Sequence, residues 1–412
     1  MPRAFYVVLA VQFISTLADN AFLILAIARV LELAESGWRI PLLKIGATAF
    51  YVLLAPIVGP VADSFRKGRV MLIANGFKVS ALLLLLGGLD PLKAILVGGW
   101  GAAVYAPAKY GLMTELLPPH DLVRANGLFE GATVCAVILG TVLGGLLVSP
   151  VMPLWSWPPE LTFCTASPTA LVAGMVVLLV LNGVATLMCV AVADSGIRYD
   201  RHSIHPVALV RRFWYENRVL WKDTQGGMSM AVTTLLWGVG ATLQLVVLRW
   251  AHVALGLPLG QAAYLQGVTA VGVVAGAALA SRYVSLGFTV RLLPLGMLLG
   301  SMIPFMLWVT TVPAAVLLLI LVGGVAGFFV VPMNALLQHR GYTLLTAGRS
   351  IAVQGFNENG GMLVMLGLYA AAMALQVSLT ALITCFGLLV TFGMAVIYAA
   401  YRAHLRTSVV KL

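Results

Sequence analysis

Long runs of apolar residues, separated by short polar breaks, recur along the whole chain. Each run has about the 20 residues that a helix needs to cross the hydrocarbon core of a bilayer. The pattern predicts twelve helices, over residues 5–33, 42–62, 70–89, 93–116, 123–148, 169–193, 226–255, 262–284, 290–311, 313–337, 350–376 and 378–402. We therefore expect an all-α integral membrane protein with twelve transmembrane helices.

The composition supports this class of protein. Of the 412 residues, 61% are hydrophobic and 9% are charged, whereas a soluble protein has about 25% charged residues. The predicted helices use most of the chain, so we expect no additional soluble domain.

The formal net charge of +11 could indicate a nucleic-acid partner, but the positions of the cations favour a membrane topology. Lys and Arg gather in every second connection between the predicted helices, including the loop 66–69 and the segment 194–223. Cytoplasmic loops of membrane proteins are enriched in these residues. The asymmetry predicts that both termini lie in the cytoplasm, and it argues against nucleic acid as a partner.

The longest polar connection divides the chain into two halves. The expected parts are a six-helix bundle over 1–193, a cytoplasmic linker over 194–225 and a second six-helix bundle over 226–412. Two short echoes support a repeat: "APAK" at 106–109 matches "VPMN" at 331–334, and "NGLFEG" at 126–131 matches "QGFNEN" at 354–359. Many transporters built from such repeats bind their substrate between the halves. Because Gly and Pro are common in membrane helices, chance similarity is the alternative.

The charged loop "GPVADSFRKGRV" at 59–70 resembles the signature loop of the major facilitator superfamily, Gly-x-x-x-Asp-Arg-x-Gly-Arg-Arg. Gly59 and Asp63 have the family's spacing, whereas the next glycine and arginine come two residues late. A carboxylate here can accept from free N–H groups at the start of a neighbouring helix. The resemblance implies that Asp63, Arg66 and Arg69 tie the two halves together. A loop that only fixes the topology is the alternative.

Ionisable residues inside the predicted helices are functional candidates, because a charge in mid-membrane costs several kcal/mol. Asp19, Lys109 and Arg249 lie in the first, fourth and seventh helices, which line the central cavity in the superfamily fold. A carboxylate suits an ammonium group, and the two cations suit a phosphate. The set predicts a site for a zwitterionic phosphate, and an internal salt bridge is the alternative.

Three further charges lie nearer the predicted cytoplasmic ends of their helices, namely Lys78, Glu130 and Glu358. We expect structural or gating roles for them, and an ion pair between Lys78 and Glu130 is one example.

Seven blocks of sequence resemble one family within the superfamily. They are "LADNA" (17–21), "APIVGPVADSFRKGRVM" (55–71), "YAPAKYG" (105–111), "VRANGL" (123–128), "VTTLLWGVGATLQLVVLRWA" (232–251), "VPMNALLQHRG" (331–341) and "AVQGFNEN" (352–359). The blocks closely resemble the bacterial lysophospholipid transporter family, LplT. The segment 149–168 does not resemble it.

The resemblance implies a fold and a set of site residues. The charged cavity residues of the family correspond to Asp19, Lys109 and Arg249, and Asn20 and Gln244 complete the expected substrate-binding set. It also implies movement of lysophosphatidylethanolamine and lysophosphatidylglycerol from the outer to the inner leaflet of a Gram-negative inner membrane, without an ion gradient. The expected partners are the lysophospholipid, membrane lipids and an acyltransferase–acyl-carrier-protein synthetase that restores the missing chain. We expect a monomer.

Two other functions compete with this one. A proton-coupled exporter or nutrient carrier would use Asp19 as its titrating group. A membrane acyltransferase would need a His with an Asp five residues later, and none of the six histidines has one. No phosphate-binding Gly-Lys-Ser/Thr loop and no metal-ligand spacing occurs, so neither an enzyme nor a cofactor is expected.

Overall fold

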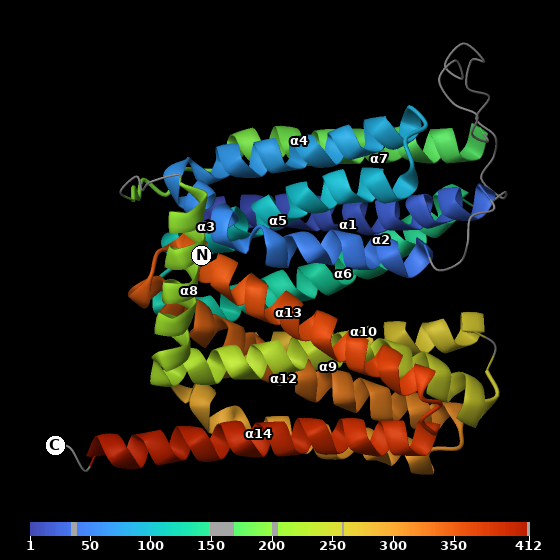
Figure 1. Ribbon diagram of the computed structural model, residues 1–412, viewed down its shortest axis with the longest axis vertical. Helices are drawn as coiled ribbons and strands as arrows, with labels where there is room; N and C mark the ends of the chain where they lie inside the picture. The colour runs from blue at the N-terminus through green and yellow to red at the C-terminus, as the bar shows by residue number, and fades with distance from the viewer. Residues whose placement is uncertain (34–38, 149–168, 200–204, 258, 410–412) are drawn as a thin grey trace. The chain divides into compact units, whose positions relative to one another are not determined.

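The computed structural model describes residues 1–33, 39–148, 169–199, 205–257 and 259–409, in which all regular structure is helical (Figure 1). The segment 149–168, which does not resemble the family, lies outside these residues. The α-helices are α1 (Arg3–Glu32), α2 (Arg39–Leu53), α3 (Ala55–Ser64), α4 (Lys67–Leu86), α5 (Pro91–Leu116), α6 (Leu122–Val148), α7 (Thr169–Met188), α8 (Pro206–Lys222), α9 (Thr224–Leu255), α10 (Leu259–Tyr283), α11 (Leu293–Met302), α12 (Val312–Leu344), α13 (Ala347–Ala374) and α14 (Leu379–Val409). The described residues also contain four 3₁₀ segments, η1 (Pro119–Asp121), η3 (Cys189–Ala191), η4 (Leu286–Leu292) and η5 (Ile303–Trp308).

The twelve predicted helices correspond to thirteen of these α-helices, and two predicted helices are less regular than expected. The continuous helix predicted over 42–62 is wrong, because the chain breaks at Leu54 between α2 and α3. Pro56 lacks an N–H, and its ring clashes with the preceding turn, which interrupts the helix. The helix predicted over 290–311 is a short α11 flanked by η4 and η5. The fourteenth helix, α8, lies in the predicted linker.

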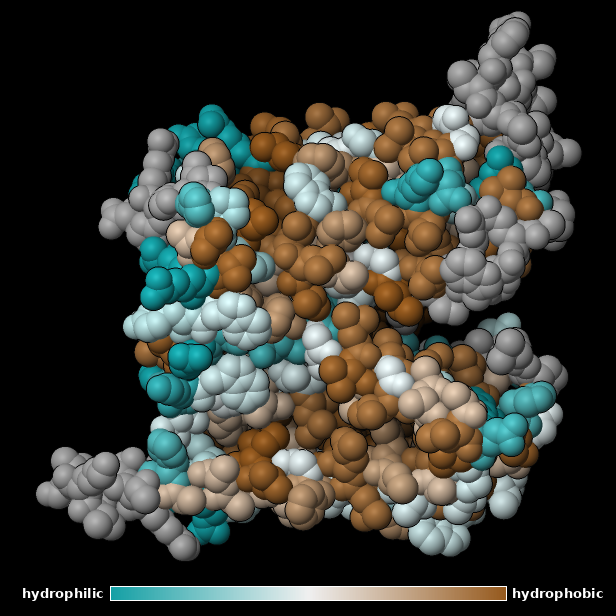
Figure 2. All heavy atoms as spheres, in the orientation of Figure 1, coloured by the Kyte–Doolittle hydropathy of each residue, from teal (hydrophilic) through white to brown (hydrophobic). Residues whose placement is uncertain are grey.

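The protein is a multi-pass membrane protein. Nine helices of the described residues are long and apolar enough to cross a membrane by length and composition. Figure 2 shows hydrophobic side chains over the sides of the helices, with hydrophilic ones gathered toward their ends. Exposed leucine, valine and phenylalanine side chains on α4, α7 and α14 contribute to this surface, as expected for helices that contact lipid tails.

The chain forms two compact units. Unit 1 contains Met1–Leu117, Cys135–Trp214 and Leu345–Gly355, and unit 2 contains Pro118–Val134, Tyr215–Leu344 and Phe356–Leu412. The first part of α6 therefore belongs to unit 2, and the first part of α13 belongs to unit 1. Residues far apart in the sequence thus meet within one unit.

Close helix contacts in both units depend on glycine. In unit 1, a Cβ atom at Gly140 of α6 would lie 2.3 Å from the Leu17 carbonyl oxygen of α1. In unit 2, a Cβ atom at Gly276 of α10 would lie 2.0 Å from the Gly324 carbonyl oxygen of α12. Lipid tails are as apolar as the helices, so membrane helices associate largely through this kind of close approach.

Candidate functional site

One face of α1 is polar, although most of the helix is apolar. Gln12, Ser15 and Asp19 follow one another at intervals of three and four residues, which places their side chains on the same side of a helix. Gln12 and Ser15 are buried in unit 1, and Asp19 is partly exposed. This polar face of α1 (Gln12, Ser15, Asp19) is the centre of the candidate substrate site.

Lys78 of α4 holds Asp19. Its Nζ donates to Asp19 Oδ2 at 2.6 Å and to Ser15 Oγ at 2.9 Å, and it lies 4.8 Å from the centre of the Tyr105 ring. The Lys78 side chain is 5% exposed, whereas that of Asp19 is 37% exposed. Lys78 thus has the expected ion pair, but with Asp19 rather than Glu130. Asp19 remains accessible at one side while its partner is buried.

The contacts of Ser15 continue into the interior of unit 1. Its hydroxyl donates to Asn75 Oδ1 at 3.1 Å, and Asn75 Nδ2 donates to Cys189 Sγ at 3.4 Å. Hydrogen-bonded networks of this kind fix the positions of buried polar groups. The network therefore orients Ser15 and, through Lys78, Asp19.

Lys109 of α5 reaches the same face of α1 one turn away. Its Nζ donates to Gln12 Oε1 at 2.8 Å and lies 4.0 Å from the centre of the Tyr110 ring. An ammonium group above an aromatic face is stabilised by the ring's quadrupole. Unit 1 therefore brings the predicted Asp19 and Lys109 to one face of α1, where Lys78 binds Asp19 and Ser15 and Lys109 binds Gln12.

The other predicted site residues have different surroundings. The Asn20 side chain donates to the Thr16 carbonyl within α1. Gln244 is exposed on α9, and Arg249 is partly buried in unit 2, where its Nη1 lies 3.0 Å from Met373 Sδ of α13. Glu130 and Glu358 are partly buried on α6 and α13.

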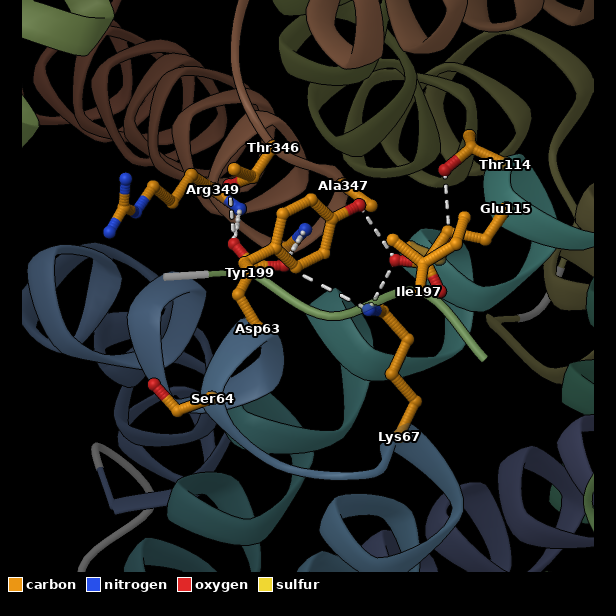
Figure 3. Close-up of polar contacts among 12 residues, drawn as sticks. Asp63, Ser64, Lys67, Thr114, Glu115, Ile197, Tyr199, Thr346, Ala347 and Arg349 are labelled. Carbon is orange, nitrogen blue, oxygen red and sulfur yellow. Dashed lines mark hydrogen bonds and ion pairs between the residues drawn. The ribbon is translucent and has the colours of Figure 1, made fainter. Parts of the chain in front are cut away.

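Asp63, at the end of α3, binds the start of α13 (Figure 3). Its Oδ1 accepts from the Gly348 N–H at 2.8 Å, and its Oδ2 accepts from the Arg349 N–H at 3.3 Å and from the Thr346 hydroxyl. Gly59 allows this approach, because a Cβ atom there would lie 2.9 Å from Arg349 Cα. The first N–H groups of a helix have no partner within the helix and carry partial positive charge. The carboxylate thus caps α13 from almost 300 residues away in the sequence.

Lys67 connects Asp63 to a second buried carboxylate. Its Nζ lies 2.5 Å from Glu115 Oε1 and 3.9 Å from Asp63 Oδ1. Tyr199, from the segment after α7, donates to the same Glu115 oxygen at 2.8 Å (Figure 3). Burial raises the pKa of Asp63 above its ordinary value, although Thr346, Lys67 and the Gly348 N–H act in the opposite direction.

The two arginines predicted for this loop lie at its surface. Arg66 Nε is 3.2 Å from Asp194 Oδ2, and Arg198 binds the same carboxylate at 2.5 Å. The hydrogen bond from Arg198 holds the pKa of Asp194 below its ordinary value. Arg69 is exposed. An exposed ion pair stabilises a fold by about 0–1 kcal/mol, so the buried Asp63 contacts dominate this site.

Sequence reasoning missed Lys67, Glu115 and Tyr199. Glu115 lies at the last turn of a predicted membrane helix, where an acid at the boundary is a weak signal. Lys67 is adjacent to predicted gating residues, but its direction could not be read from spacing. The described residues contain no group of three His, Cys, Asp or Glu side chains arranged to hold a metal ion.

Comparisons with known proteins identify the family. The model of the Major Facilitator Superfamily matches residues 8–364. Proteins from Yersinia pestis and Yersinia pseudotuberculosis, both named lysophospholipid transporter LplT, are 39% identical to this chain over 378 residues, covering 91% of this chain and 88% of the relatives. The chain belongs to the LplT family of the Major Facilitator Superfamily.

Solved structures agree with this family at the level of the fold. The human organic anion transporter TETRAN matches with a TM-score of 0.72 at 14% identity, covering 96% of this chain and 100% of that one. The transporter FucP in the outward conformation matches with a TM-score of 0.69 at 15% identity, covering 97% of each chain. The LplT family member described here therefore has the superfamily fold, and the family places it among transporters rather than enzymes.

Proposed function

We propose that this protein transports lysophospholipids across the bacterial inner membrane. The substrates are lysophosphatidylethanolamine and lysophosphatidylglycerol, which move from the outer to the inner leaflet and are then reacylated by an acyltransferase–acyl-carrier-protein synthetase. The observation that carries the proposal is the polar face of α1, where Asp19, Lys78 and Lys109 gather around Ser15 and Gln12 in an otherwise apolar helix. The names of the curated relatives point to the same substrate class.

The chemistry of this face matches a lysophospholipid head group. Lys109 supplies a cation for the phosphate, and the partly exposed Asp19 supplies a carboxylate for the ethanolamine ammonium group. Arg249 of unit 2 is a further proposed phosphate-binding residue. The single acyl chain stays in lipid while the head group moves along the polar face, so the path opens sideways to the bilayer.

Transport follows alternating access between two six-helix halves, 1–193 and 226–412, connected by the linker 194–225. Asp63, capping the start of α13, closes the cytoplasmic end in one of the alternating states, and Arg66 and Arg69 add exposed charge to that end. Both termini lie in the cytoplasm, and the protein acts as a monomer. The positive charge of alternate loops supports the proposed topology, and the buried Asp63 contacts support the proposed gate.

Uptake into vesicles tests this function directly. Labelled lysophosphatidylethanolamine is added outside vesicles that contain the protein and an enclosed acyltransferase, and the diacyl product is measured. We expect product to form at a rate that depends on the transporter and falls when Lys109 is replaced by Met. Equal product formation in vesicles without the transporter would refute the proposal.

A further inference from the structure

One side of the helix α8 is exposed and the opposite side is buried. Its side chains Phe213, Glu216, Asn217 and Leu220 are buried. The exposed apolar residues Val207, Val210, Trp214 and Trp221 repeat at helical spacing and form one stripe, which we call the apolar stripe of α8. Trp221 is 41% exposed, and its Nε1 donates to Asn357 Oδ1 of α13 at 3.0 Å. Trp214 is 51% exposed and Val207 is 69% exposed, so much of the apolar stripe lies on the surface of the protein.

A row of cations runs beside the apolar stripe. Arg211, Arg218 and Lys222 are all exposed and are separated by seven and four residues, which places them on one side of the helix. The only acid of α8, Glu216, is 6% exposed and lies on the buried side. The exposed face therefore combines aromatic and aliphatic side chains with an uncompensated positive row, which we call the basic row of α8.

The position of α8 relative to a membrane-spanning helix identifies what covers this face. Lys222 ends α8, and Asp223 caps α9, which begins at Thr224 and is one of the apolar spans. The cap is firmly held, since Arg340 binds Asp223 through Nε at 3.0 Å and Nη2 at 2.5 Å. Figure 1 shows α8 running across the direction of α9. A helix that crosses the direction of a span at the span's first residue lies at the depth of the lipid head groups.

We propose that the exposed face of α8 binds anionic phospholipid head groups at the membrane surface. The apolar stripe enters the boundary between head groups and acyl chains, where Trp side chains are enriched. The basic row lies against the phosphates. Helices with this division between apolar and basic faces bind in the plane of the membrane surface, and each cation near an anionic surface strengthens binding about fivefold. This site is separate from the transport site and does not depend on the transported substrate.

Fluorescence of the full-length protein in nanodiscs tests the depth of the apolar stripe. The four native cysteines are replaced by Ser, and an environment-sensitive dye is attached at Trp214→Cys or, as a matched control on the same helix, at the exposed Ala208→Cys. Nanodiscs contain phosphatidylcholine with brominated acyl chains and increasing fractions of phosphatidylglycerol. We expect quenching at position 214 that increases with phosphatidylglycerol, and at most weak quenching at position 208.

Charge variants then test the basic row. Three cations contributing about fivefold each strengthen binding by about a hundredfold in total. The variant Arg211→Gln/Arg218→Gln/Lys222→Gln should therefore not reach half-maximal quenching at phosphatidylglycerol fractions that saturate the parent protein. A variant with the same net charge, Arg282→Gln/Arg291→Gln/Arg402→Gln, should behave as the parent protein, and so should Arg211→Lys/Arg218→Lys/Lys222→Arg. If position 214 stays unquenched at every lipid composition, or if the two neutralised variants behave alike, the proposal is wrong.

Discussion

The ion pair between Asp19 and Lys78 can be tested with a double-mutant cycle, in which we expect the two single variants to lose unequal amounts of stability. Its members are Asp19→Asn, Lys78→Met and the double variant. Lys78 Nζ is 2.6 Å from Asp19 Oδ2, but the lysine is 5% exposed and the aspartate is 37% exposed. The two single changes therefore leave unlike residues behind: a buried ammonium group in one case, and a carboxylate that water can reach in the other.

The expected magnitudes follow from that difference in exposure. Leaving a buried charge without its partner costs about 3–5 kcal/mol, and Lys78 keeps its contacts with Ser15 and Tyr105, so we expect about 3 kcal/mol for Asp19→Asn. Lys78→Met leaves Asp19 without its partner, but water can reach this carboxylate. We therefore expect a cost of about 1 kcal/mol, near the value of a surface ion pair. The double variant leaves no charge and should recover about 2 kcal/mol relative to Asp19→Asn.

Thermal unfolding in detergent measures the cycle. At about 2–4 °C per kcal/mol for a unit of this size, Asp19→Asn should lower the apparent Tm by roughly 6–12 °C and Lys78→Met by roughly 2–4 °C.

The same variants should change substrate preference. Asp19→Asn leaves an uncompensated cation, so uptake of the anionic lysophosphatidylglycerol should fall less than that of lysophosphatidylethanolamine, and Lys78→Met should have the opposite effect.

Pairing Asp19→Asn with Lys109→Met is the control, because Lys109 bonds Gln12 rather than Asp19. In this double variant the losses of stability from the two changes should add, and no stability should be recovered. Equal losses of stability for Asp19→Asn and Lys78→Met, or recovery with Lys109→Met but not with Lys78→Met, would refute the pairing. Unchanged substrate preference in both single variants would show that the pair is only structural.

Three further predictions concern the gate, the energy source and pH. Asp63→Asn should weaken the contact with Gly348, favour states open to the cytoplasm and slow transport, whereas unchanged cysteine accessibility on both faces would leave the loop only a topological role. A protonophore should leave initial lysolipid uptake nearly intact, and loss of most uptake would instead support proton coupling. Burial raises the pKa of Asp223, but hydrogen bonds from Arg340 and the Gly226 N–H outweigh it and lower that pKa. The resulting stability is present above about pH 4 and lost below it, and Arg340→Gln should remove this acid dependence from the melting temperature; the same acid dependence in Arg340→Gln would contradict it.

The sequence by itself determined the class of the protein and the approximate positions of its membrane helices. Apolar runs of sufficient length must form helices in a bilayer, because no water is present to satisfy backbone groups. These backbone hydrogen bonds lie within each segment, so the helices can be predicted from the segment alone. The break at Leu54 was also present in the sequence, since Pro56 and Pro60 follow it within six residues. The helix α8 was missed because its apolar residues are too few for a span, although they recur with a helical period.

The sequence also identified Asp19, Lys109 and Asp63 as unusual, because the cost of placing a charge in or beside a membrane can be judged one residue at a time. It could not name their partners. Asp19 binds Lys78, although Lys109 and Arg249 carry the same charge. For Asp63 the sequence suggested N–H groups at the start of a helix, but it could not identify that helix as α13, which begins almost 300 residues later. Pairing depends on which helix faces meet and how closely. Those contacts are fixed by the approach of glycines such as Gly59 to a distant backbone, so only the tertiary structure decides them.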